Sequence, residues 1–293
     1  MKNEITLNVV QGVGDIFWVY QKMSPYFDVI NFNVSIVSKD MVQVRARDWV
    51  QALPKAGKVQ FVAVERPTYN TLARQKCTMD EVMELASGPA RNAGIDYCCN
   101  RWLEEGVRIE DIDPKYHVEW NIPFPIAEMP LNFKEYSVFY VSANVKSESA
   151  VAQGGWSMEQ WIELFNLYQD HIDSSLPVVV IGALFDIDAI REIGAAMKAR
   201  GTPCQQIVQA SPSRVMHILT NSKYFIGLQS GLNILADNFD VKQLMIYYPC
   251  LEPMMYAWCK QKNIKTLFNA YLFTQTPAEV FEQAIASSSL PNA

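Results

Sequence analysis

The sequence predicts an α/β protein with two doubly wound, mostly parallel sheets. Short apolar runs typical of buried strands alternate with amphipathic runs typical of helices along most of the chain. The chain has 293 residues, of which 49% are hydrophobic, so it is long and apolar enough for two domains. Several strand-like runs end in loops of small or polar residues that lead into a helix, as at the carboxyl ends of parallel strands.

In the first half of the chain, three apolar runs are expected to form strands: residues 5–10, 33–37 and 59–64. Three helices are expected: from about residue 16, over 41–52 and over 79–86. Thr78 and Glu81 have the spacing of a capping box before the last of these helices. The proline-containing stretch 100–130 predicts loops and short pieces.

The second half alternates more regularly. Strands are expected at residues 137–142, 177–181, 206–208, 224–227 and 243–247. Helices are expected over residues 157–171, 187–200, from 211, 229–238 and 278–286. Ser157 and Gln160 form a capping box, and Gly201 has the place of a C-terminal cap. We place the domain boundary at 134/135 and expect two Rossmann-like domains, 1–134 and 135–293, facing each other across a cleft.

Composition excludes several classes of protein. The 31 acidic residues outnumber the 25 Lys and Arg, and the net charge of -6 argues against generic duplex DNA binding. No apolar run approaches the length of about 20 residues that a membrane span needs, and no signal sequence is recognised, so we expect a cytoplasmic, soluble protein. The six cysteines form no CxxC pair and there are three histidines, so neither a zinc site nor a disulfide framework is expected.

The first candidate site is the loop Gly12-Val13-Gly14-Asp15, between a strand and a helix. Gly12 and Gly14 allow a tight turn and close approach of the backbone to a ligand. The loop lacks the third glycine of a dinucleotide fingerprint, because Phe17 stands there. Asp15 is either the N-cap of the helix or a carboxylate that accepts a proton from an acceptor hydroxyl.

Two further strand-end loops suit a phosphate. Ser142, Asn144 and Lys146 follow a strand and combine hydrogen-bond donors with a positive charge, although the same residues also suit an ordinary solvated loop. Ser230 and Gly231 lie between a strand and a helix, where they either bind a diphosphate or only cap the helix.

A weaker candidate site follows the strand that ends near Gly182. An acid after such a strand often binds a ribose hydroxyl, and both Asp186 and Asp188 are candidates. Asp186 equally suits a helix N-cap. Structural roles are favoured for the three histidines, His117, His171 and His217. The spacing of Trp161, Phe165 and Tyr168 indicates the buried face of a helix.

These motifs, in this order, resemble the ADP-heptose:lipopolysaccharide heptosyltransferase family (glycosyltransferase family 9), which has GT-B architecture. The resemblance gives Asp15, in the Gly-Asp loop, the role of catalytic base. It implies that Lys146 and its loop bind a phosphate. Trp156 matches the tryptophan that the family has just before a helix, and Gly182 matches the glycine that ends the family's next strand. The stretch 229–236 resembles the family's acid-Ser/Thr-Gly-x-x-His-x-Ala loop, with Gln229 for the acid and Ile234 for the histidine.

The resemblance implies a metal-independent glycosyltransferase with no cofactor, which moves a sugar from a nucleotide-diphosphate sugar to an acceptor hydroxyl. The first domain would bind the acceptor. The donor would lie on the second domain, at the residues Gly182, Gln229, Ser230, Gly231 and Asn233 and at the loop 142–146, with Gly12 and Gly14 lining the cleft. Three alternatives stay open: a non-catalytic nucleotide-sugar-binding module, a transferase acting on modified DNA or protein, and a sugar-nucleotide epimerase. A Rossmann oxidoreductase is disfavoured by Phe17.

Overall fold

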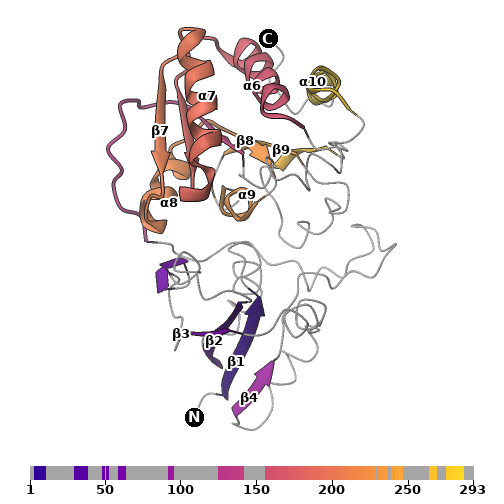
Figure 1. The fold of residues 1–293 in the computed structure, drawn as a ribbon. Helices are drawn as coiled ribbons and strands as arrows, with labels where there is room; N and C mark the ends of the chain where they lie inside the picture. Colours follow the sequence, from indigo (N-terminus) through magenta and orange to yellow (C-terminus); the bar gives the residue numbers. More distant parts are fainter. Residues whose placement is uncertain are drawn as a thin grey trace. The chain divides into compact units, whose positions relative to one another are not determined.

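The computed structural model describes residues 3–10, 30–38, 48–49, 51–52, 59–63, 92–95, 125–141, 156–228, 230–236, 239, 241–246, 264–268 and 275–286. The chain divides into two compact units (Figure 1). One comprises Met1–Pro125 with Met254–Gln261, and the other comprises Ile126–Pro253 with Lys262–Ala293. None of the described helices has the length and hydropathy needed to cross a bilayer.

The first unit contains a four-stranded parallel sheet. Its strands are β1 (Asn3–Val10), β2 (Ile30–Ser38), β3 (Val59–Ala63) and β4 (Asn92–Ile95), in the order β3-β2-β1-β4. The strands expected in the first half are confirmed. The short β4, whose sequence Asn-Ala-Gly-Ile has little strand character, was not expected; it pairs with β1 from Glu4 to Leu7.

The second unit contains a six-stranded sheet in which every pair is parallel. Its strands are β5 (Ser137–Tyr140), β6 (Val178–Gly182), β7 (Cys204–Val208), β8 (Tyr224–Leu228), β9 (Lys242–Ile246) and β10 (Ile264–Phe268). Their order across the sheet is β10-β9-β8-β5-β6-β7. Counted along the chain within this unit, the order is 3-2-1-4-5-6, that of a Rossmann sheet.

The second unit's helices begin and end close to the predicted bounds. They are α6 (Met158–Ile172), α7 (Ile187–Ala199), α8 (Pro212–Thr220), α9 (Gly231–Ala236) and α10 (Pro277–Ala286), with the 3-10 turn η5 (Leu184–Asp186) before α7. The capping box of α6 is confirmed: Gln160 N–H donates to Ser157 Oγ (3.4 Å), and Ser157 N–H donates to Gln160 Oε1 (2.9 Å). Gly201, after α7, has a φ of +82°, which favours glycine.

An aromatic core lies between α6 and the sheet. As the spacing predicts, Trp161, Phe165 and Tyr168 are buried, and the rings of Phe165 and Phe139 stack with centroids 4.3 Å apart. Helices α6, α7 and α10 all contribute side chains to this core, and α10 packs against α6. Each large side chain buried here stabilises the fold by about 1.5–3 kcal/mol.

Residues 126–134, at the start of the second unit, are hydrogen-bonded to α8 and to the edge strand β7. Ala127 N–H donates to the Ser213 carbonyl (3.1 Å). The Gln205 side chain then makes two bonds, accepting from Asn132 N–H (3.0 Å) and donating to the Pro130 carbonyl (3.2 Å). Figure 1 shows this segment running beside β7 and α8. The segment is therefore tied to the second unit through α8 and through one side chain of the edge strand.

Candidate functional site

The sheet of the second unit reverses its winding between β5 and β8. These strands are direct neighbours, with Tyr140 paired to Gly227, yet β5 leads on to β6 on one side and β8 leads on to β9 on the other. From these two adjacent carboxyl ends the chain therefore goes on to strands on opposite sides of the junction. Ligands of doubly wound sheets bind at such a point.

Gly227 brings these two strands close together. A Cβ at this position would lie 2.1 Å from the carbonyl oxygen of Tyr140, which is backbone and has no rotamer to adopt. Only glycine fits here without moving one strand. The sequence therefore encodes a tight junction of β5 and β8 near the carboxyl ends of both strands.

Ser230 lies just after β8 and caps α9. Its Oγ accepts the N–H of Leu232 (3.2 Å) and donates to Oδ1 of Asn233 (2.9 Å). Asn233 is fully buried, whereas Ser230 and Gly231 are half-buried. The capping role considered for Ser230 is thus present, and its hydroxyl proton is directed at Asn233. A phosphate oxygen would receive that proton only after the hydroxyl has rotated.

Gly182 ends β6 against Asp186. The carboxylate of Asp186 is fully buried, and its Oδ2 accepts the N–H of Ala183 (2.8 Å). A Cβ on Gly182 would lie 2.8 Å from Cβ of Asp186, so glycine is required at this turn. Asp186 thus stabilises the turn η5, and Asp188 lies exposed at the start of α7, where it faces Arg191 (3.9 Å). The turn also holds two exposed apolar side chains, Leu184 and Phe185, which the sequence alone did not single out.

The first unit repeats the same topological feature. β1 lies between β2 and β4, and the chain passes from β1 to β2 on one side and reaches β4 on the other. The Gly-Asp loop follows β1, whose last residue is Val10. The sequence position of this loop thus corresponds to the carboxyl end of the strand at the switch point.

Seven of the predicted site residues lie outside the described residues: Gly12, Gly14, Asp15, Ser142, Asn144, Lys146 and Gln229. Within the described part, no group of three His, Cys, Asp or Glu side chains could hold a metal ion. Cys204 is a free, half-buried thiol, and its burial raises the pKa of the thiol to about 11.

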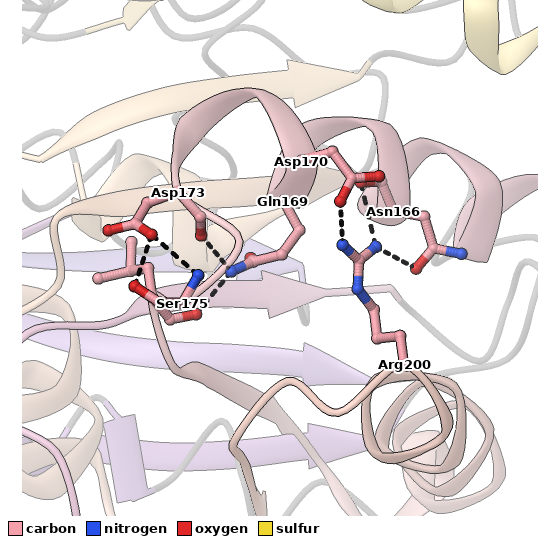
Figure 2. Close-up of polar contacts among 7 residues, drawn as sticks. Asn166, Gln169, Asp170, Asp173, Ser175 and Arg200 are labelled. Atoms are coloured by element: carbon pink, nitrogen blue, oxygen red, sulfur yellow. Dashed lines mark hydrogen bonds and ion pairs between the residues drawn. The ribbon is translucent and has the colours of Figure 1, made fainter.

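A cluster of polar side chains in the described part of the second unit lies at the other end of the helices. Figure 2 shows Arg200, at the end of α7, reaching Asp170 and Asn166 of α6, with a bond of 2.9 Å from Arg200 Nη1 to Asn166 Oδ1. Hydrogen bonds from the hydroxyl and N–H of Ser175 lower the pKa of the Asp173 carboxyl. These residues join helix C-termini, which lie toward the amino edge of a parallel sheet, so they stabilise the fold and are not part of the candidate site.

Comparison with solved structures places this fold among glycosyltransferases. The chain superposes on ADP-heptose lipopolysaccharide heptosyltransferase II of E. coli with a TM-score of 0.56 and 14% identity, covering 98% of each chain. E. coli heptosyltransferase WaaC with ADP gives 0.53 and 14%, covering 97% of this chain and 99% of that one. A family 9 glycosyl transferase of Veillonella parvula gives 0.55 and 11%, covering 98% of each.

The similarity is one of structure. The sequence matches no protein-family model and no curated protein. The α/β fold expected from the sequence, and the GT-B architecture implied by its resemblance to family 9, are confirmed by these neighbours. The chain therefore has the fold of the heptosyltransferases.

Proposed function

We propose that the protein is a glycosyltransferase that moves a sugar from a nucleotide-diphosphate sugar to an acceptor hydroxyl, without a metal ion. The observation that carries the proposal is the switch point of the second sheet. Both loops predicted to bind phosphate follow the two strands that meet there, β5 and β8. The structural neighbours, one of them solved with ADP, support a nucleoside diphosphate as part of the donor.

The second unit would bind the donor. Lys146 supplies positive charge to the diphosphate, and Ser142, Asn144 and the backbone near Gly231 supply hydrogen-bond donors. These groups stabilise the negative charge that develops on the diphosphate as its bond to the sugar breaks. A lysine and backbone dipoles thus do the work that a divalent cation does in other phosphate sites.

The first unit would bind the acceptor, with Asp15 as base. The acceptor oxygen attacks the anomeric carbon of the donor sugar, its proton passes to the Asp15 carboxylate, and the diphosphate leaves with the electron pair of the broken C–O bond. An exposed aspartate has a pKa of about 3.9 and is a weak base. Exclusion of water by the bound substrates would raise that pKa and make Asp15 more effective.

Asp15→Asn tests this assignment. The amide keeps the size and the capping ability of the side chain but accepts no proton, so we expect turnover to fall by about 100-fold or more while donor affinity is kept. Sugar transfer is followed by mass spectrometry over a panel of nucleotide sugars and saccharide acceptors. Asp170→Asn, an exposed aspartate of α6 in the cluster that lies away from the candidate site, is the matched control and should leave turnover unchanged. Full turnover in Asp15→Asn would remove this residue from the mechanism.

A second candidate function is a nucleotide-sugar-binding module without catalysis. Gln229 and Ile234 favour it, since they stand where the resembling family has an acid and a histidine. Calorimetry with the same nucleotide sugars separates the two functions. Binding with neither transfer nor hydrolysis indicates the module, and binding with transfer indicates the enzyme. Acceptors on protein or modified DNA belong in the panel, because the sequence leaves the acceptor class open.

A further inference from the structure

Two adjacent apolar side chains are exposed at the carboxyl end of β6. Leu184 is 62% exposed and Phe185 is 53% exposed. Among the described residues, the one other large hydrophobic side chain exposed to this degree is Ile126. Leu184 and Phe185 belong to the turn η5, which directly follows a strand that neighbours β5. The pair therefore lies at the same sheet edge as the switch point.

The turn that presents this pair is held in place from within. The buried carboxylate of Asp186 accepts the N–H of Ala183 (2.8 Å), and Asp186 N–H donates to the Ala183 carbonyl (3.0 Å). These reciprocal bonds close the turn around its two middle residues. Since Gly182 admits no Cβ beside Asp186, the turn packs tightly onto the strand end. The exposure of Leu184 and Phe185 is thus part of a built conformation.

The neighbouring loop is fixed to this turn. Gln209, just after β7, donates its N–H to the Gly182 carbonyl (2.8 Å) and has a φ of +55°. Residues other than glycine adopt this conformation uncommonly. The ends of β6 and β7 therefore form one connected edge, beside the point at which the diphosphate is proposed to bind.

The position of this edge indicates its ligand. In Rossmann sheets the diphosphate lies at the end of the first strand, and an acid at the end of the second strand binds the ribose. β6 is the second strand of this sheet, and the acid after it, Asp186, has its Oδ2 on the backbone of its own turn. Within the turn η5 the exposed side chains are therefore the apolar Leu184 and Phe185, while the exposed carboxylate of Asp188 lies beyond the turn, at the start of α7.

We propose that Leu184 and Phe185 form the contact surface for the nucleobase of the donor. This inference rests on the proposed function, because it takes the diphosphate to lie between β5 and β8. The chemistry is stacking and apolar contact with a flat heterocycle, which every base offers. Recognition through these two side chains favours no single base strongly, so selection among donors falls to the sugar and the diphosphate.

The test compares a ligand that has a base with one that lacks it. Calorimetry is run on the full chain with ADP, UDP and GDP, and with inorganic pyrophosphate. Phe185→Ala should weaken nucleoside diphosphates by roughly 5- to 100-fold, the range that loss of one stacking partner gives, and leave pyrophosphate unchanged. Leu184→Ala should have the same selectivity with a smaller loss. Phe185→Tyr keeps the ring and should keep the affinity.

Ile126→Ala is the matched control, since it removes an apolar side chain of similar exposure from another segment. All three positions, 126, 184 and 185, are exposed, so the midpoint of thermal unfolding should stay within a few degrees of the parent in every variant. Equal affinities of the parent and Phe185→Ala for all three nucleotides would overturn the inference and leave the proposed function standing. If the parent bound neither nucleotides nor pyrophosphate, the proposed function would fail, and this inference with it.

Discussion

The junction between β5 and β8 makes Gly227→Ala the most informative single change to the fold. The added Cβ would lie 2.1 Å from the Tyr140 carbonyl oxygen, whereas real Cβ contacts are essentially never closer than 3.0 Å. The oxygen is backbone, so the two central strands must move apart by about 1 Å. Overpacking of this kind costs about 1–3 kcal/mol. For a unit of this size that lowers the unfolding midpoint by roughly 2–12 °C.

Differential scanning calorimetry of the full chain measures the shift, and hydrogen exchange of the peptides containing β5 and β8 locates it. Gly201→Ala is the control. That position has a φ of +82° but nothing within 4 Å of a new Cβ, so the cost is backbone strain of about 1–2 kcal/mol with no strand displaced. Only Gly227→Ala should also weaken nucleotide binding. A Gly227→Ala protein with the parental midpoint and affinity would refute this reasoning.

Three further outcomes follow from individual contacts. Gln205→Ala removes both side-chain bonds to residues 130 and 132 and should speed amide exchange there, as mass spectrometry detects; unchanged exchange would mean that the segment is held by other contacts. Trp156→Phe loses a 2.8 Å hydrogen bond to the Gln275 carbonyl, whereas the buried Nε1 of Trp161 has no hydrogen-bond partner to lose. In urea titrations Trp161→Phe should therefore lower the free energy of unfolding by about 1 kcal/mol less than Trp156→Phe does. Equal losses of stability would contradict this. Burial raises the pKa of Cys204 from 9.0 to about 11, so the parent should lose stability relative to Cys204→Ala as pH rises from 9 to 11; parallel pH profiles would contradict this.

The second unit could be predicted from the sequence in most of its elements, because local signals and tertiary structure agree there. Apolar runs bounded by glycine, proline or polar residues predicted β5, β6, β7, β8 and β9, and the capping box at Ser157 predicted the start of α6. The helical spacing of Trp161, Phe165 and Tyr168 identified a buried face. Each of these features is determined by residues that are close together in the sequence.

What sequence reasoning missed depends on contacts made over long distances. β4 and β10 are short and flanked by polar residues, and they become strands by pairing with β1 and β9. The sequence also could not decide whether Asp186 binds a ribose or stabilises its own turn. Its burial and its bond to Ala183 come from the packing of η5 against β6, which no local pattern of charges reveals. The exposure of Leu184 and Phe185 follows from the same packing.

The site is predictable as a set of strand ends. The sequence identifies the loops after β1, β5 and β8 as polar or glycine-containing, and the two sheet orders explain why those three strands matter, since each lies at a switch point. The identities of donor and acceptor are not encoded in this way. They depend on the side chains that line the bound substrate, and so on the whole fold.

Calorimetric titration of nucleoside diphosphates into the parent protein and into Lys146→Ala tests most directly whether a diphosphate binds between β5 and β8. Lys198→Ala, in the last turn of α7 at the other end of the sheet, is the control for loss of positive charge. We expect the parent to bind at least one nucleoside diphosphate, Lys146→Ala to bind it about tenfold or more weakly, and Lys198→Ala to match the parent. Equal affinities in all three proteins, or no binding by the parent, would contradict the assignment.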